Sequence, residues 1–255
     1  MIGGSASFFL APIIGATIAS AWGWRSAFTV LAVPTIVFGV VFYILLGQRM
    51  PAEKVDHIKT STQGEAPATP GRLRRLVAFM ILSTFNAAAF FSTIPFIPLF
   101  LVDHHGISKE TAAALLALIY SAGFWASPLG GYLSDRWGKA PVVLAVCFIS
   151  GPVIYLINVV PYQWGIVALL LITGMIMYVR MPVSEAYILS HTSERHRSTV
   201  LGIYFFGSLE GGGVITPVLG YLVDQFGFYP TFAIAGAAVV VVTLLCSIWL
   251  WASRD

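Results

Sequence analysis

The sequence predicts an all-α, polytopic membrane protein. Hydrophobic residues make up 58% of the 255 residues, charged residues only 10%, and the mean hydropathy is +0.85, whereas a soluble domain carries about a quarter charged residues. Apolar runs of about 20 residues, long enough to cross a hydrocarbon core as a helix, recur along the chain. These runs are too long for the strands of a membrane barrel and lack the alternation of polar and apolar residues found in such strands. The predicted fold is therefore a bundle of membrane-spanning helices.

Eight spans are predicted from the apolar runs and the turn residues between them. The predicted spans are residues 3–21, 27–46, 76–101, 109–133, 141–159, 164–188, 199–222 and 230–251. No basic segment precedes the first run, so a cleavable signal peptide is not predicted.

Basic residues predict the orientation of these spans. One side of the membrane receives Arg49, Lys54, Lys59, Arg72, Arg74, Arg75, Arg136, Lys139, Arg195, Arg197 and Arg254. The other side receives only Arg25 and Lys109. By the positive-inside rule the first side is cytoplasmic, which places both termini and the linker of residues 47–75 there. We therefore expect a multi-pass protein of the plasma membrane.

Several other classes of protein are not indicated. Cys147 and Cys246 lie inside apolar runs without metal-ligand spacing, so neither a metal site nor a disulfide framework is predicted. The net charge of +3 is explained by the loops between spans, so no nucleic acid partner is predicted. No nucleotide-binding G-x-x-x-x-G-K-S/T loop is present, and no cofactor is expected.

Two parts of the chain resemble each other. Residues 11–15 and 23–28 have counterparts in residues 216–220 and 227–232, with an offset of 205 residues at the shared proline. An offset of this size corresponds to six helices with their loops, and parallel six-helix repeats build one large class of transporters. Chance recurrence is the alternative, because Pro and Gly are common in membrane helices.

The loop between the fourth and fifth predicted spans reads Gly-Gly-Tyr-Leu-Ser-Asp-Arg-Trp-Gly-Lys. Gly131 is expected to allow close helix approach, and Gly138 a sharp reversal of the chain. The carboxylate of Asp135 is expected to meet a helix N-terminus or a guanidinium. Arg136 and Lys139 would hold the loop in the cytoplasm. The alternative is an ordinary charged turn.

This loop resembles the G-x-L-x-D-R-x-G-K/R signature of the major facilitator superfamily. The resemblance implies that residues 1–46 are the last two helices of an N-terminal half and residues 76–255 a complete C-terminal half of six helices. The chain would then hold the fifth to twelfth helices of a transporter truncated at its N-terminus, and its uncovered helix faces could form an oligomer. Ala11-Pro12-x-x-Gly15 resembles a degenerate antiporter motif in which Ala11 and Ala16 replace two glycines.

Polar groups inside the spans are candidates for transport, because a charged side chain in lipid costs several kcal/mol unless it is paired or hydrated. Glu210 lies near the middle of the seventh span and is the first candidate for proton coupling or for binding a cation; a structural hydrogen bond is the alternative. Arg180 lies inside the sixth span, where it would meet Glu210 or an anionic substrate. Glu185 is expected to be solvated or paired with a loop, and Asn86 to line a cavity.

His104 and His105, with Asp103, form a short sequence capable of binding a metal, although a solvated outer loop is the favoured interpretation.

The leading functional hypothesis is secondary active transport of a small solute, such as a drug or metabolite, by alternating access coupled to protons. An enzyme is not predicted, since no catalytic motif is present. The remaining alternative is a truncated, non-transporting remnant that binds a partner or lipid.

Overall fold

The computed structural model describes residues 2–49, 70–161 and 164–252, and helices account for nearly all of them. The helices are α1 (Ile2–Trp22), α2 (Trp24–Arg49), α3 (Pro70–Thr93), α4 (Phe96–His105), α5 (Lys109–Ser121), α6 (Ala126–Trp137), α7 (Lys139–Val159), α8 (Trp164–His191), α9 (Arg197–Phe226) and α10 (Phe228–Ala252). Two short 3₁₀ turns, η1 (Ala122–Phe124) and η2 (Glu194–His196), lie between them. No strand occurs in the described ranges, and the all-α prediction is confirmed.

Every predicted span lies mainly in helices of the structure. Six helical segments are long and apolar enough to cross a membrane. The pair formed by α5 with η1 and α6 is a seventh candidate, and residues 10–22 of α1 form a shorter apolar helix. The chain is therefore an integral, multi-pass membrane protein.

Two of the predicted spans are interrupted. The span predicted at 76–101 is divided into α3 and α4 by a turn at Ile94 and Pro95. The span predicted at 109–133 bends by 44° between η1 and α6. Pro128 lies in the first turn of α6 and has no N–H to donate to the carbonyl of Phe124, which explains why a continuous helix does not form there.

The predicted linker is longer than the gap between helices. α2 continues to Arg49, and α3 already begins at Pro70, since proline is well suited to the first position of a helix. The rest of that prediction, residues 50–69, lies outside the described residues.

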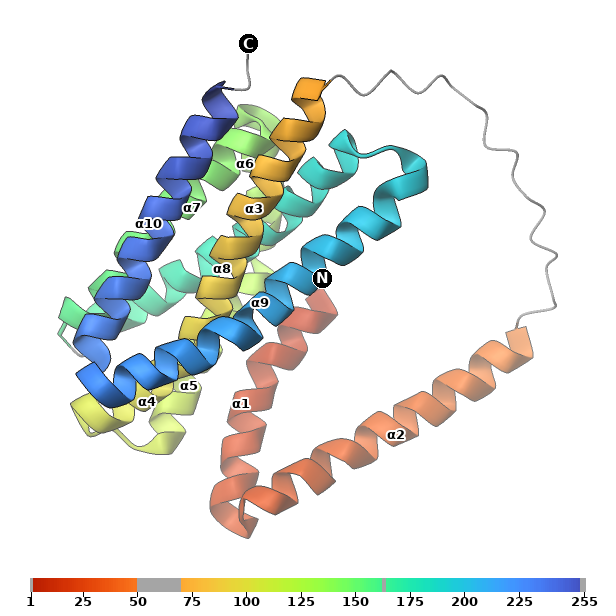
Figure 1. The fold of residues 1–255 in the computed structure, drawn as a ribbon. Helices are drawn as coiled ribbons and strands as arrows, with labels where there is room; N and C mark the ends of the chain where they lie inside the picture. The colour runs from red at the N-terminus through yellow and green to blue at the C-terminus, as the bar shows by residue number, and fades with distance from the viewer. Residues whose placement is uncertain (1, 50–69, 162–163, 253–255) are drawn as a thin grey trace.

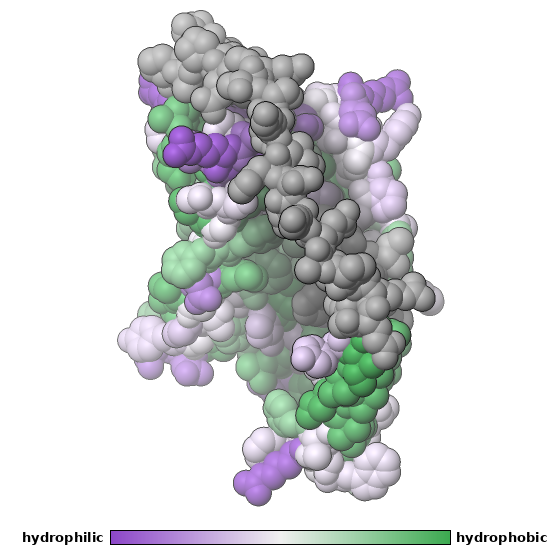
Figure 2. Space-filling view, turned by 90° about the vertical axis from the view of Figure 1, so that its right-hand side faces the viewer, coloured by the Kyte–Doolittle hydropathy of each residue, from purple (hydrophilic) through white to green (hydrophobic). Residues whose placement is uncertain are grey.

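The helices from α3 to α10 pack into one bundle, as Figure 1 shows. α3 lies along α9, and α7 lies between α8 and α10. α1 packs against α5 and η1, whereas α2 packs against α1 and projects away from the bundle. Hydrophobic side chains cover much of the middle of the face in Figure 2, and most hydrophilic ones lie toward its ends. This distribution suits a bundle surrounded by lipid.

Glycines set the closest approaches within the bundle. A Cβ on Gly174 of α8 would lie 2.2 Å from the carbonyl oxygen of Ile119 in α5. A Cβ on Gly236 of α10 would lie 2.7 Å from the carbonyl oxygen of Gly151 in α7. Small residues at such positions let helix backbones approach closely, and this close packing is a main source of helix association in lipid.

Candidate functional site

Arg180 is the one arginine or lysine of the described spans that lies far from a helix end, and it is only 2% exposed. It projects from α8 beside buried apolar residues that include Val179 and Val183. A cation at such a position costs about 3 kcal/mol or more, unless neighbouring groups stabilise it. The surroundings of this side chain therefore decide what the site can do.

Arg180 joins three helices through a polar cluster. Its Nη1 donates to the carbonyl oxygen of Ser83 at 3.1 Å, to Ser83 Oγ at 3.3 Å and to Tyr204 Oη at 3.4 Å. Ser83 Oγ in turn donates to Ser184 Oγ at 2.8 Å. We name Arg180, Ser83, Ser184 and Tyr204 the arginine cluster; it connects α8 with α3 and α9.

No carboxylate lies within 4.0 Å of Arg180 in the described part of the protein, although Glu185 interacts with its charge over a longer distance. The ion pair found there within 4.0 Å joins Arg197 to Glu194, at 3.5 Å. All the hydrogen bonds of the Arg180 guanidinium are made by Nη1, so among the described residues Nε and Nη2 have no acceptor. This Nε–Nη2 edge is the fork with which arginine binds a carboxylate through two parallel hydrogen bonds.

The two acidic candidates lie in different environments. Glu185 follows Arg180 on α8, is partly buried, and its Oε1 is buried without a hydrogen-bond partner. The five-residue spacing predicts no close pair with Arg180, and none forms within 4.0 Å in the described ranges. Glu210 is exposed on α9, on the face opposite Tyr204 and Ser208, and does not reach Arg180.

Asn86 is 1% exposed, and its Nδ2 donates to Ser150 Oγ of α7 at 2.7 Å, whereas its Oδ1 is buried without a hydrogen-bond partner. The amide therefore holds α3 against α7 in the interior of the bundle. The expectation that Asn86 lines a cavity stays a prediction.

The loop motif adopts the predicted reversal, but through partly different residues. Gly138 has φ +88 and separates α6 from α7, as expected of a glycine at a sharp turn. The close helix approach predicted for Gly131 is made by Gly130, whose Cβ would lie 3.0 Å from the backbone of Val179. Lys139 donates to the carbonyl oxygen of Ala186 at 3.1 Å and so ties the loop to α8.

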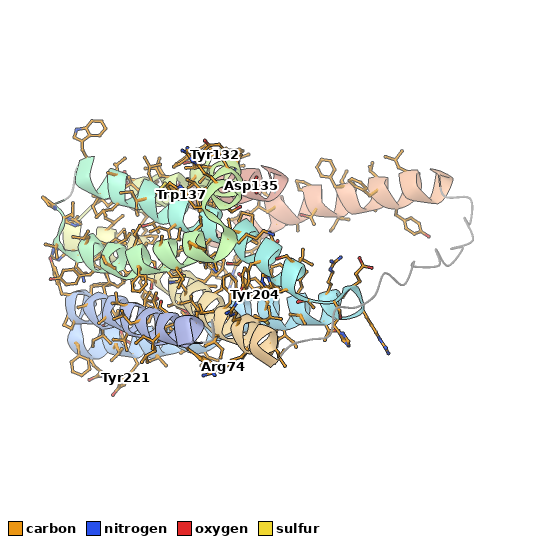
Figure 3. All side chains as sticks on the ribbon, turned by 90° about the horizontal axis from the view of Figure 1, so that it is seen from above. Arg74, Tyr132, Asp135, Trp137, Tyr204 and Tyr221 are labelled. Carbon is orange, nitrogen blue, oxygen red and sulfur yellow. The ribbon has the colours of Figure 1, made fainter. Side chains whose placement is uncertain are left out.

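Asp135 makes neither of its predicted contacts in the described structure. Its side chain is exposed and has no ion pair within 4.0 Å. Arg136 Nη1 donates to Tyr132 Oη, and the two atoms are 3.5 Å apart. Figure 3 shows Tyr132, Asp135 and Trp137 close together at one edge of the molecule, apart from Tyr204 among the helices.

The two adjacent histidines lie in the last turn of α4 and not in a free loop. His104 stacks on Phe100 and hydrogen-bonds through Nε2 to Tyr229 Oη of α10. Asn158 Nδ2 of α7 donates to the carbonyl oxygen of Tyr229 at 3.0 Å. This group of side chains connects α4, α7 and α10 at one end of the bundle.

Sequence analysis missed three members of the arginine cluster. Ser83, Ser184 and Tyr204 look like ordinary small or aromatic residues of membrane helices. Ser83 and Tyr204 bind Arg180 from other helices, and Ser184 binds Ser83, which a single sequence does not reveal. The weak signal available was the presence of hydroxyl groups inside otherwise apolar runs.

The chain matches a known family along its length. Residues 1–123 and 79–255 match the family model described as Major Facilitator Superfamily.

Curated relatives cover more than one substrate type. The hexuronate transporter of Bacillus subtilis is 27% identical over 255 residues, which is 91% of this chain and 59% of the relative. The multidrug resistance protein MdtG of Escherichia fergusonii is 28% identical over 181 residues, which is 68% of this chain and 44% of the relative. The chain thus spans about half the length of these relatives.

Solved structures share the fold at low identity. A bacterial homologue of the human lysosomal transporter Spinster, inward-facing and unoccupied, has a TM-score of 0.65 and 17% identity. That likeness covers 99% of this chain and 68% of the solved one. The same homologue in its occupied form has a TM-score of 0.60 over 98% of this chain and 65% of the solved one.

Proposed function

Because this chain belongs to the major facilitator superfamily, we propose that it takes part in secondary transport of a small organic solute across the plasma membrane. The transporter works by alternating access and is coupled to protons, with both termini of this chain in the cytoplasm. The observation that supports this function best is the buried charge of Arg180 at the meeting of α3, α8 and α9, where no described carboxylate lies within 4.0 Å of it. Intramembrane charges of this kind mark substrate or ion pathways.

Proton coupling requires a carboxyl group whose environment changes during the cycle. Glu185 fits this role because it lies on the same helix as Arg180 and has a buried oxygen without a hydrogen-bond partner. A buried carboxyl group is more stable when it is protonated, and it releases the proton once water reaches the group. Glu210 is the second candidate, and its exposed position on α9 would suit coupling if that face meets a water-filled pathway.

Uptake into proteoliposomes under an imposed proton gradient tests the proposal. A screen of sugars, sugar acids and drugs should find at least one solute whose uptake stops when the gradient is collapsed. Glu185→Gln cannot release a proton, so gradient-driven uptake should fall to the level of empty vesicles while exchange of solute across the membrane continues. Glu210→Gln is the comparison variant. Gradient-driven uptake that is unchanged in both variants contradicts the assignment of the coupling group.

The non-transporting alternative makes a different prediction in the same assay. Nearly all described side chains of α2 are exposed and most of them are apolar, a surface suited to lipid or to other helices. A protein that only binds lipid or a partner would give neither gradient-driven uptake nor exchange for any solute of the screen.

A further inference from the structure

We propose that Arg180 binds the carboxylate of a small, singly charged organic anion, and that this anion is the substrate class of the transporter. The inference rests on the proposed function and adds the chemical class of the solute. Its basis is the combination of three features: a cation that is 2% exposed, the absence of a carboxylate within 4.0 Å among the described residues, and a vacant hydrogen-bonding edge.

The cluster orients the guanidinium for such a ligand. Ser83 and Tyr204 both accept from Nη1, which fixes one end of the planar group. The opposite edge, Nε and Nη2, then points away from these acceptors. Two parallel N–H donors at fixed spacing match the two oxygens of a carboxylate. Lysine would offer a point charge without this geometry.

The number of charges at the site indicates a monoanion. Within the described residues no other lysine or arginine lies deep inside a span, and Glu185, which interacts electrostatically with Arg180, is neutral when it carries its proton. One positive charge is then available at this depth. A carboxylate neutralises that charge, whereas a doubly charged phosphate would leave a negative charge in a medium of low dielectric constant.

A second polar group lies on the same face of α9 as Tyr204. Ser208 lies one turn after Tyr204, is 5% exposed, and its Oγ is buried without a hydrogen-bond partner. Buried hydroxyls are almost always hydrogen-bonded, so an orphaned one indicates an absent partner. A hydroxyl group on the substrate would supply it, which favours hydroxy acids among the carboxylates.

Binding measurements without any gradient test this inference separately from transport. The purified protein in lipid nanodiscs is titrated by calorimetry with gluconate, glucuronate, lactate and benzoate, with glucose as the neutral match and glucose 6-phosphate as the doubly charged one. At least one carboxylate should bind well above glucose and glucose 6-phosphate. Equal or tighter binding of glucose or of glucose 6-phosphate overturns the assignment.

Variants distinguish a binding role of Arg180 from a structural one. Arg180→Gln should weaken carboxylate binding about 100-fold, the effect of removing one partner of a buried charged pair, and Arg180→Lys, which keeps the charge and the fold, about tenfold. Asn158→Ala breaks a hydrogen bond between α7 and α10 that lies outside the arginine cluster, so binding should change less than threefold. Arg25→Gln, which removes an exposed charge, should have no effect.

The outcomes separate the two proposals. If Asn158→Ala lowers affinity as much as Arg180→Lys, the losses reflect helix packing and the inference fails. If a neutral solute is transported and Arg180→Lys leaves its transport intact, the inference fails while the proposed function stands. If carboxylates bind in an Arg180-dependent way but no solute crosses the membrane, the binding site stands and the transport function fails.

Discussion

At the scale of single residues, the charged side chains of this protein fall into two groups. Asp135, Arg136 and Glu194 are exposed at helix ends, where water screens them and their pairs contribute little. Arg180 and Glu185 lie inside a span, where each polar contact counts more because the dielectric constant is low. Function is therefore expected from the second group.

Gly138 gives a residue-scale prediction. Its φ of +88 and ψ of +152 lie in a region that is essentially restricted to glycine. Gly138→Ala should therefore lower the free energy of unfolding by about 2 kcal/mol, measured by denaturant titration in micelles with circular dichroism. Gly131→Ala is the matched control on the same loop motif, because a Cβ there meets nothing within 4 Å. Equal losses in both variants would mean that the turn conformation is not the cause.

At the scale of elements, the sequence predicted where helices exist better than where they break. Long apolar runs identify a span directly, and the first turn of α6 shows why its interruption was missed: Pro128 acts on a hydrogen bond four residues earlier, so its effect depends on the whole local path of the chain. The sequence also assigned the close helix approach to Gly131, whereas Gly130 makes it, for a similar reason. Which of two neighbours faces another helix is decided by the register of packing between α6 and α8.

Gly174 tests the packing of elements. Alanine normally favours a helix over glycine by about 1 kcal/mol, but a Cβ at Gly174 would lie 2.2 Å from a backbone oxygen of α5, which has no room to move. Gly174→Ala should therefore destabilise the protein by about 3 kcal/mol through overpacking. Gly202→Ala on α9, where nothing lies within 4 Å, should leave the midpoint of thermal unfolding unchanged or raise it. A raised midpoint for Gly174→Ala would contradict the close contact of α5 and α8.

At the scale of the whole molecule, the packing is uneven along the chain. The helices from α3 to α10 contact one another on several sides, whereas α1 touches the bundle through α5 and η1 and α2 packs on α1. The arginine cluster draws its members from α3, α8 and α9, all within the first group. The division proposed from the sequence, with a complete six-helix half in the C-terminal part, stays a prediction, since α1 packs on α5 as well as on α2.

A deletion tests whether this division is also one of stability. Residues 70–255 retain all helices of the bundle, so we expect this fragment to remain monodisperse in detergent and to unfold within a few degrees of the full chain. The control is a chain ending at residue 227, which lacks α10 and so exposes the packed surfaces of α3, α7 and α9. That chain should aggregate, because membrane helices associate mainly through such packing. If the 70–255 fragment aggregates as readily as the control, α1 and α2 are part of the stable core and the two-part description fails.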